Sequence, residues 1–557
     1  MCGLLTLIKK DINENEINKF KLSLNKINYR GPDFSKVVKK ENILFGHNRL
    51  KILDLSDKSN QPYEYKNFIL LFNGCIYNFK ELREELKHKY NFTTTGDTEV
   101  LMYSLIEWGQ EALNKIDGMY AFLFFDGEKI MASVDFFGEK PLYLYQDNDQ
   151  IMISSEISPI KSYLKEKLQV KRNNDQLKEF YHLGFLLGEK TIYQNLYKLS
   201  NKKIYFIDDQ LKLDRIEKKS KISKKFNIKI SDIHDELILS IKNRLNSDVL
   251  VGLFLSSGLD STLLATIIKK ELKVDIDTFS FYEKKESETI KYLKSITNYL
   301  GIKSKVINNL SHEFKNQDFK DAYQDINECD TYFPYYEMCK YLKDKTNIKV
   351  ILSGMGADEI FYGYNKYEFF YKYRYLYKIN EIIFNRIIFF SKKFNLNFLN
   401  KLKIFSGNNF ARFLKIKNND HDINIEKIYE FNFKKEIFEA AREFDIKNTL
   451  PISLIPALER ASMRFSLESR SPYLSKKLLD LVNNLEDKST FFKEQKYIQK
   501  QILRKYLPEK YIAKRKEGFF YKNPSVFKAN TKLQNKYELN LKNFRYNQRA
   551  EIYDLFQ

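Results

Sequence analysis

The chain has 557 residues, of which 43% are hydrophobic and 30% charged, with a formal net charge of +21. This length exceeds what one hydrophobic core usually serves, so we expect at least two domains. The start lacks a secretory pattern, no stretch is apolar and long enough to cross a bilayer, and the four cysteines are scattered. These features predict a cytoplasmic protein without a membrane span or a disulfide framework.

The basic surplus is also typical of nucleic-acid-binding proteins. However, the basic residues are mainly lysines spread along a sequence rich in Asn, Ile, Phe and Tyr. An AT-rich genome explains such a bias. The densest basic and aromatic stretch, residues 364–417, has aromatic residues at helical spacing, which indicates packed helices. We therefore expect no specific nucleic-acid partner, and salt-sensitive binding to DNA or RNA is the test of that alternative.

Residues 1–205 predict stacked antiparallel sheets. Short apolar runs such as "FILLFNG", "YAFLFFD" and "PLYLY" are separated by turn residues, as strands of such sheets are. Two helical segments interrupt them, "NFKELREELKHKY" and "DTEVLMYSLIEWGQEALNKI".

The first residue of this region that can carry chemistry is Cys2. Removal of Met1 would give Cys2 both a thiol nucleophile and an α-amine that can act as its base. A thiol that attacks an amide also needs an oxyanion hole, and Asn73 with Gly74 in "FNGCIYN" offers a donor pair at a predicted turn. Taken singly, a cysteine here is more often chance, and an Asn-Gly pair is more often a hairpin turn.

Two charged residues could hold the ends of a zwitterionic substrate. Arg49 lies in a strand-like setting, where its guanidinium could bind a carboxylate through two bonds. Asp97 directly precedes a predicted helix and could bind an ammonium group. The plainer alternatives are a surface ion pair for Arg49 and a helix cap for Asp97.

A polar, lysine-rich stretch, residues 206–227, is predicted to be a linker between domains 1–205 and 228–557. Beyond it, buried strands such as "VLVGLFLS", "IDTFSFY" and "IKVILSG" alternate with helices. This alternation predicts a parallel α/β sheet, followed by a largely helical C-terminal part.

Two strands of this second domain end in small residues. In "FLSSGLDST" the free amides of a strand-to-helix turn can form a nest for phosphate oxygens, although an ordinary turn is the plain alternative. In "VILSGMGADEIFYGY" the turn is followed by Asp358 and Glu359, and carboxylates near phosphates are natural Mg²⁺ ligands.

These motifs resemble one family in order and over most of the chain. A first set of motifs is similar to the N-terminal-nucleophile glutaminase domain of class II amidotransferases. These motifs are Cys2-Gly3, "RGPD", "HNRLKILD", "NGCIYN", "GDTEV" and "FFGEKPLYLY". A second set of motifs resembles the ATP-pyrophosphatase domain of asparagine synthetases. It consists of the two small-residue turns described above and the segments "ERASMRFSLESRSPYL" and "KRKEGFFYKNP". The resemblance implies an αββα sandwich, fused to a parallel α/β domain that adenylates a carboxylate for attack by ammonia.

The resemblance also implies roles for individual residues, and these roles are expectations. In the first domain Cys2 is the nucleophile, Asn73 and Gly74 hold the oxyanion, and glutamine is bound by Arg49, Leu50, Ile52, Leu53, Asn73, Gly74, Cys75 and Asp97. In the second domain ATP is bound by Leu255, Ser256, Gly258, Asp260, Ser261, Phe281, Ser353 and Gly354. Asp260 and Asp358 hold Mg²⁺, and Lys516 stabilises charge on the transferring phosphate.

Four positions depart from the family pattern. Cys75 replaces a glutamate that helps to hold the glutamine amine, and Ser257 replaces a glycine of the nucleotide loop. Met355 stands where an acidic residue serves the acyl-adenylate step, and Ser475 stands where Asp is common. Because Met carries no charge and takes no proton, Met355 is the candidate that sets the acceptor site.

The expected substrates are therefore glutamine, ATP and a carboxylate acceptor, with aspartate favoured over a sugar acid or a peptide. Ammonia would travel inside the protein, since the two chemistries occupy separate domains. Lactam- or peptide-cyclising relatives are less favoured because they tend to lose a working glutaminase, and a purely structural relative would not retain both sets of residues. A homodimer is expected only because the family often forms one.

Overall fold

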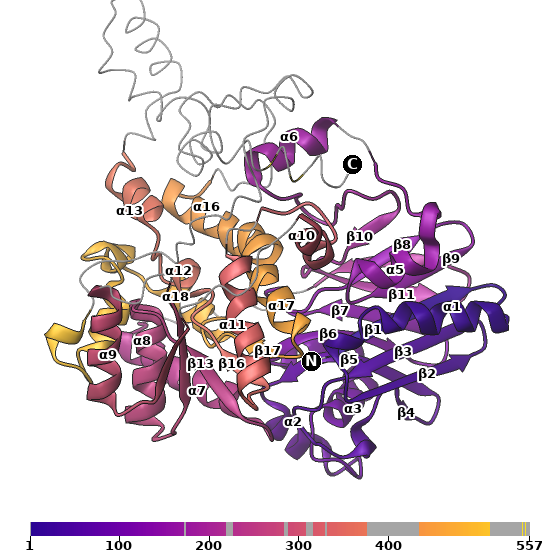
Figure 1. Ribbon diagram of the computed structural model, residues 1–557, viewed down its shortest axis with the longest axis horizontal. Helices are drawn as coiled ribbons and strands as arrows, with labels where there is room; N and C mark the ends of the chain where they lie inside the picture. Colours follow the sequence, from indigo (N-terminus) through magenta and orange to yellow (C-terminus); the bar gives the residue numbers. More distant parts are fainter. Residues whose placement is uncertain are drawn as a thin grey trace, which may run out of the picture.

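The computed structural model describes residues 2–171, 174–218, 227–282, 288–307, 316–328, 331–375, 434–512, 549 and 552. Figure 1 shows two bodies side by side, an indigo-to-magenta N-terminal part and a later part coloured magenta to yellow. No helix in the described part of the chain is both long and apolar enough to cross a membrane.

The N-terminal part contains two six-stranded sheets, both fully antiparallel. The first has the strand order β10-β8-β9-β1-β3-β2 and the second β12-β11-β7-β6-β5-β4. The strands of the first sheet are β1 (Gly3–Lys9), β2 (Phe34–Lys40), β3 (Ile43–Arg49), β8 (Tyr143–Gln146), β9 (Gln150–Ser154) and β10 (Leu196–Lys198). Those of the second are β4 (Tyr63–Tyr65), β5 (Phe68–Ile76), β6 (Gly118–Phe125), β7 (Lys129–Val134), β11 (Lys203–Asp208) and β12 (Leu213–Glu217).

Side chains along β5 alternate between the two faces of its sheet, which shows why these strands form a sandwich. Ile69 and Leu71 pack between the two sheets, while Leu70 and Phe72 pack against helices on the outer face. Successive side chains of a strand point to opposite faces, so a continuously apolar strand is buried on both. The helices of this part are α1 (Glu14–Asn25), α2 (Phe79–Leu86), α3 (Thr98–Trp108), α4 (Ala112–Lys115), α5 (Ile157–Leu164) and α6 (Asn174–Leu183).

Helices α1 and α5 cover the first sheet, and α2 and α3 cover the second. The predicted αββα sandwich is therefore confirmed. The expectation of two helical segments is wrong, because α1, α5 and α6 were not predicted. In α1 the buried positions are Phe20, Ser23 and Leu24, a narrow stripe in a polar, lysine-containing segment that gives a weak amphipathic signal.

The second part is built on a parallel five-stranded sheet of order β15-β14-β13-β16-β17. Its strands are β13 (Val251–Phe254), β14 (Asp277–Phe281), β15 (Ser304–Ile307), β16 (Val350–Leu352) and β17 (Glu468–Arg470). Its helices are α7 (Ile230–Leu245), α8 (Leu259–Thr266), α9 (Glu288–Leu300), α10 (Asn316–Tyr323), α11 (Tyr332–Lys345), α12 (Ala357–Ile360), α13 (Asn365–Lys372), α16 (Ile437–Phe444), α17 (Ile455–Arg464), α18 (Lys476–Asn484) and α19 (Tyr497–Leu503).

Both faces of this sheet are covered, as a parallel sheet requires. Leu253 packs with α7, α8 and α9 on one face, whereas the adjacent Phe254 packs with α11 and α17 on the other. The predicted parallel α/β domain with a helical C-terminal part is confirmed. Residues 376–417 of the predicted basic helical stretch lie outside the described residues.

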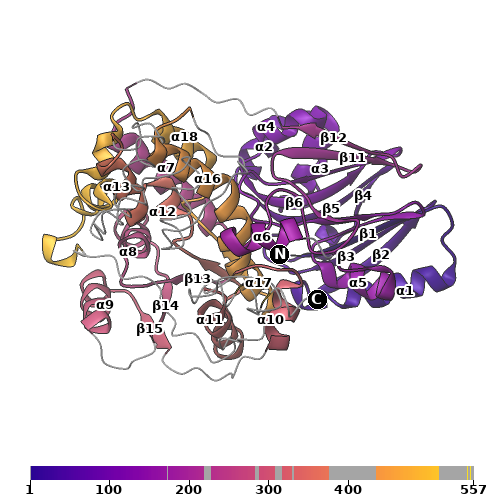
Figure 2. The ribbon, with the colours of Figure 1, turned by 90° about the horizontal axis from the view of Figure 1, so that it is seen from above.

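The boundary between the two parts is a buried interface (Figure 2). One apolar cluster contains Leu5 and Tyr143 of the first part together with Ala457 and Ala461 of α17. Buried charges also cross it, since Arg30 forms ion pairs with Glu156 at 2.7 Å and with Glu459 of α17. Strands β11 and β12 take up much of the predicted linker, and the exact domain boundaries stay a prediction.

Candidate active site

Most of the predicted glutaminase residues line one small cavity. Its volume is about 30 Å³, and it lies where β1, β3, β5 and the start of α3 meet. The predicted residues among its lining are Cys2, Arg49, Leu50, Ile52, Leu53, Gly74, Cys75 and Asp97. Folding thus gathers side chains that are nearly a hundred positions apart in sequence.

Cys2 directly precedes β1 and is buried. Its backbone nitrogen donates a hydrogen bond to Asn73 Oδ1 at 2.8 Å, which fixes the start of β1 against β5. Burial raises the pKa of the Cys2 thiol, while the Leu50 amide and the charge of Arg49 act to lower it. The nucleophile therefore needs a base beside it to be active near neutral pH.

Asn73 and Gly74 lie inside β5, so the predicted turn is wrong. They pair with Ala121 and Tyr120 of β6, because the strand continues through the Asn-Gly pair to Ile76. A Cβ on residue 74 would lie 2.1 Å from the carbonyl oxygen of Met119, so this close approach demands glycine. The Asn73 Nδ2 group is buried and has no hydrogen-bond partner among the described residues, which leaves a donor available.

Arg49 ends β3 and is only 4% exposed, which excludes the surface ion pair considered above. Its Nη1 donates to Ser56 O at 2.7 Å and to Asn60 Oδ1 at 2.8 Å. Its Nη2 donates to the carbonyl oxygens of Leu53, at 3.4 Å, and Asp54. Arg49 thereby organises the loop after β3 while its charge faces the cavity.

Asp97 precedes α3 but makes no side-chain cap bond to that helix. Its Oδ2 instead accepts a hydrogen bond from the Ile76 amide at 2.9 Å, which links it to the end of β5. Burial raises the pKa of Asp97 to about 6, although this hydrogen bond acts in the opposite direction. The helix-cap alternative is therefore wrong for this carboxylate.

Two residues that sequence reasoning missed also line this cavity. Glu468 and Arg470 belong to β17 of the second part, inside the motif "SLESRSPYL". Arg470 Nε donates to Glu468 Oε1 at 2.6 Å, and both side chains are almost fully buried. No local signal could place them here, since they lie about 370 positions after Asp97 and reach it only through domain packing.

The first of the two loops that are predicted to bind the nucleotide joins β13 to α8. Ser256 and Ser261 share a hydroxyl contact at 2.9 Å, and the Gly258 amide donates to Ser256 Oγ at 3.1 Å. Ser257 does not adopt a positive φ, so replacing the family glycine costs no strained backbone here. Its amide donates to the hydroxyl of Tyr282 at 2.8 Å.

The second nucleotide loop, between β16 and α12, packs against the first. A Cβ on Gly354 would lie 3.5 Å from Cβ of Asp260, and Ser353 Oγ contacts Ser471 Oγ at 2.9 Å. Gly356 has φ +85° and would clash with Leu474 if it carried a side chain. Figure 1 shows β13 and β16 side by side, so both loops leave the same edge of the sheet.

Three further predicted residues surround these loops. Leu255 directly follows β13, and Phe281 is the last residue of β14. Met355 is half-buried and packs on the apolar clusters of both sheet faces, including the one that contains Phe254 and Phe281. The acceptor candidate therefore presents an apolar wall in place of a charge.

A lysine that sequence reasoning missed lies between the two predicted metal ligands. Lys496 precedes α19, is 5% exposed, and forms ion pairs with Asp260 and, at 2.9 Å, with Asp358. Asp260 and Asp358 therefore lie close together beside the two predicted nucleotide loops. Carboxylate oxygens are ligands that Mg²⁺ prefers, so this pair fits a Mg²⁺ site. Lys516 lies outside the described residues.

Two neighbours of these loops have structural roles. Ser475 caps α18 by accepting a hydrogen bond from the Leu478 amide at 3.2 Å, which explains a small polar residue where the family often has Asp. Glu359 accepts a hydrogen bond from the Tyr364 hydroxyl at 2.6 Å, and burial raises its pKa to about 7. The Glu359 carboxylate thus bonds to Tyr364 and not to the Asp260–Lys496 pair.

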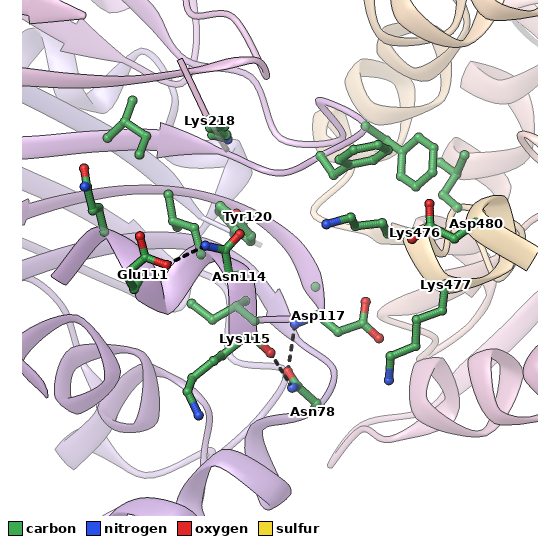
Figure 3. A pocket seen from close by; sticks show the side chains of 18 of the residues that line it. Asn78, Glu111, Asn114, Lys115, Asp117, Tyr120, Lys218, Lys476, Lys477 and Asp480 are labelled. Carbon is green, nitrogen blue, oxygen red and sulfur yellow. Dashed lines mark hydrogen bonds between the residues drawn. The ribbon is translucent and has the colours of Figure 1, made fainter. Parts of the chain in front are cut away.

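A larger cavity, of about 360 Å³, lies elsewhere on the domain boundary (Figure 3). None of the residues predicted above to carry chemistry lines it. Its lining has four lysines and four carboxylates: Lys115, Lys218, Lys476 and Lys477 against Glu111, Asp117, Glu217 and Asp480. These formal charges balance, so the lining carries no net formal charge.

Comparison with known proteins agrees with this architecture. A glutamine amidotransferase domain model matches residues 1–216, and an asparagine synthase model matches residues 232–549. The chain is 32% identical over 412 residues to a putative glutamine-hydrolysing asparagine synthetase 2 of Methanocaldococcus jannaschii, covering 65% of this chain and 76% of that relative. It is 28% identical over 537 residues to the glutamine-hydrolysing asparagine synthetase 1 of Bacillus subtilis, covering 88% and 82%.

Among solved structures, the glutamine phosphoribosylpyrophosphate amidotransferase of B. subtilis matches 64% of this chain and 82% of its own, at 14% identity and a TM-score of 0.31. The sequence matches define the class, an enzyme with an amidotransferase domain ahead of a synthase domain. Because the synthase model covers more than half of the chain, the chain belongs to the asparagine synthase family, which confirms the resemblance.

Proposed function

We propose that this protein transfers the amide nitrogen of glutamine to a carboxylate that it activates with ATP, and that the carboxylate is aspartate. One observation carries the proposal: Cys2, Arg49, Gly74 and Asp97 line a single cavity, with Asn73 hydrogen-bonded to Cys2 at its edge. These are a nucleophile, two oxyanion donors and two opposite charges, the set that hydrolysis of glutamine requires.

In the glutaminase half, Cys2 is the nucleophile once Met1 has been removed. Its α-amine takes the thiol proton, and Asn73 Oδ1 holds that amine in place. The thiolate attacks the amide carbon, and negative charge develops on the amide oxygen. Asn73 Nδ2 and the Gly74 amide are the donors that stabilise this charge. Asp97 binds the α-ammonium group of glutamine, and the charge of Arg49 attracts its carboxylate.

In the synthase half, the loops at Ser256–Ser261 and Ser353–Met355 bind ATP. Leu255 and Phe281 contribute apolar contacts at the ends of β13 and β14. Asp260 and Asp358 hold Mg²⁺, which neutralises phosphate charge when bound. Lys496 already lies between these two carboxylates, so it is well placed to contact the phosphates as well. Lys516 keeps the role that the resemblance implies.

Two observations bear on the identity of the acceptor carboxylate. Full-length similarity to asparagine synthetases favours aspartate. The apolar surroundings of Met355 instead favour a carboxylate that does not need an acidic partner, such as a sugar acid or a peptide. Ammonia would pass between the halves inside the protein, across their buried boundary.

Purified protein incubated with glutamine, Mg-ATP and aspartate tests this proposal. Mass spectrometry is expected to detect glutamate, AMP and asparagine together. Glutamate without AMP or asparagine would support the glutaminase half and exclude aspartate as acceptor. Absence of glutamate under conditions where the protein is folded would contradict the proposal.

The pKa of Asp97 leads to a pH prediction for glutamine hydrolysis. Its proton is retained up to a pH of about 6, and the protonated acid cannot bind an ammonium group. We expect Asp97 to give kcat/KM for glutamine an acid limb, with a fall of about tenfold per pH unit below pH 6. Steady-state assays of glutamate release between pH 5 and 8 measure this limb.

Two variants test whether Asp97, and not another acid, causes this pH dependence. Asp97→Asn is expected to lower kcat/KM at pH 7 at least tenfold and to remove the limb. Asp57→Asn is the matched control, because Asp57 is an exposed acid on the loop that Arg49 organises. A limb that persists unchanged in Asp97→Asn would assign the titration to another group.

A further inference from the structure

Lys496 is a buried cation between the two carboxylates that are predicted to hold Mg²⁺. Its Nζ pairs with Asp260 Oδ2 and, at 2.9 Å, with Asp358 Oδ1. The lysine side chain is almost fully buried, and both carboxylate side chains are less than one-fifth exposed. One ammonium group therefore bonds to an oxygen atom of each acid and neutralises one of their two negative charges.

The backbone at Lys496 places its side chain in this position. Lys496 directly precedes α19 and has φ +58° and ψ +40°, in the left-handed region that residues with a Cβ seldom adopt. Such a conformation persists where the surrounding structure holds it, and it is often found at ligand sites. Gln499 of α19 also reaches the pair, since its Nε2 donates to Asp260 Oδ1 at 3.4 Å. The start of α19 is thus held against the Asp260 carboxylate.

The two carboxylates are brought together by the two predicted nucleotide loops. Asp260 lies in the first turn of α8, and Asp358 lies in the first turn of α12. A Cβ on Gly363 would lie 2.1 Å from Asp358 Oδ1, so glycine at position 363 leaves room for this carboxylate. Two carboxylates at one place disfavour each other's charge unless a cation lies between them. In this structure the ammonium of Lys496 lies there.

A divalent cation and Lys496 would compete for the same two acids. Mg²⁺ takes carboxylate oxygens as ligands, and Lys496 already bonds to one oxygen atom of each acid. A metal ion that binds alone must therefore displace a buried ammonium from two ion pairs at once. Phosphate oxygens would offer this ammonium new acceptors, so metal and nucleotide that bind together avoid much of this loss.

We propose that Lys496 substitutes for the divalent cation between Asp260 and Asp358 before a nucleotide binds, and turns to the phosphates when metal and nucleotide enter together. This inference rests on the proposed ATP-binding function and refines it. It makes Mg²⁺ a ligand of the complex with the nucleotide, which the protein alone binds weakly. The plainer alternative is a structural ion pair that stays intact when the nucleotide binds.

Binding of Mn²⁺ without nucleotide tests the first half of the proposal. Free Mn²⁺ gives a strong electron paramagnetic resonance signal that bound Mn²⁺ largely loses, so a titration yields the dissociation constant. We expect Lys496→Gln to bind Mn²⁺ at least about tenfold more tightly than the original protein, because two buried carboxylates have then lost their cation. Equal Mn²⁺ affinities of Lys496→Gln and the original protein would overturn the inference.

The matched control for this titration is Lys500→Gln. Lys500 is a buried lysine of the same helix, and it pairs with Glu494 at 2.8 Å and not with Asp260 or Asp358. Its replacement should leave the Mn²⁺ affinity unchanged. A gain in Lys500→Gln as large as that in Lys496→Gln would assign the effect to general loss of positive charge and would overturn the inference.

Binding of ATP without metal tests the second half. Isothermal titration in the presence of EDTA is expected to show a roughly 10–100-fold loss of ATP affinity in Lys496→Gln, the range for one charged hydrogen bond. Lys496→Arg keeps the charge and should recover most of this affinity. An ATP affinity in Lys496→Gln equal to that of the original protein would overturn the inference.

The original protein keeps the inference testable if Lys496→Gln does not fold. A ligand that binds the folded state raises the thermal unfolding midpoint, so Mn²⁺ alone should leave this midpoint unchanged. A rise with Mn²⁺ alone that Asp358→Asn abolishes would overturn the inference. Folded original protein that binds no Mg-ATP would instead contradict the proposed function itself.

Discussion

Replacing Cys2 with alanine is expected to lower glutamine-dependent synthesis by at least about 10³-fold, the scale on which a missing nucleophile acts. Ammonia-dependent synthesis should stay within twofold of the original protein. The reason is spatial: Cys2 lies in the glutaminase cavity, whereas the nucleotide loops lie on β13 and β16 of the other half. Parallel assays of AMP release with glutamine and with ammonium chloride measure both activities.

The control for this variant is Cys339→Ala. Cys339 is also a free, buried thiol, but it lies in α11 and packs in the core of the synthase half. It should retain both activities. Glutamine-driven turnover that survived in Cys2→Ala would show that Cys2 is not the nucleophile.

Arg30→Met is expected to have the largest effect on stability. Arg30 is fully buried and pairs with Glu156 and Glu459, and its Nε donates to the Cys2 carbonyl oxygen at 3.2 Å. Burial opposes ionisation of Glu459, but Arg30 and Lys140 outweigh it and hold the pKa of Glu459 below its usual value. Removing the guanidinium would take the ion-pair partner from two buried carboxylates, at a cost of about 3–5 kcal/mol.

Differential scanning calorimetry measures this loss as a fall of several degrees in the first unfolding midpoint. Glutamine hydrolysis should fall as well, because the start of β1 loses its contact with Arg30. Lys36→Met is the matched control, since Lys36 pairs with Glu64 at 2.8 Å on the surface and such pairs contribute about 0–1 kcal/mol. Equal midpoints for the two variants would contradict the assigned role of Arg30.

Much of the fold was predictable because its signals are local. Helix α7 coincides with the amphipathic segment "ISDIHDELILSIKNRL", and β13 with α8 follows the apolar run and small-residue turn of "FLSSGLDST". Strand and helix periods follow from local backbone geometry and from which face is buried, and both can be read from the residue pattern. Helix α1 was missed because its buried stripe is narrow and interrupted by polar residues.

The candidate site was only partly predictable, and the reason is distance along the chain. The sequence by itself determined the residue types: a cysteine at position 2, an Asn-Gly pair, an acid before a helix and two small-residue loops. The tertiary structure alone decided that Asn73 and Gly74 lie in a paired strand, because β6 supplies the hydrogen bonds that extend β5 through them. It also brought Arg470 to the Cys2 cavity and Lys496 to Asp260, since such contacts arise from packing between elements and leave no trace in local periodicity.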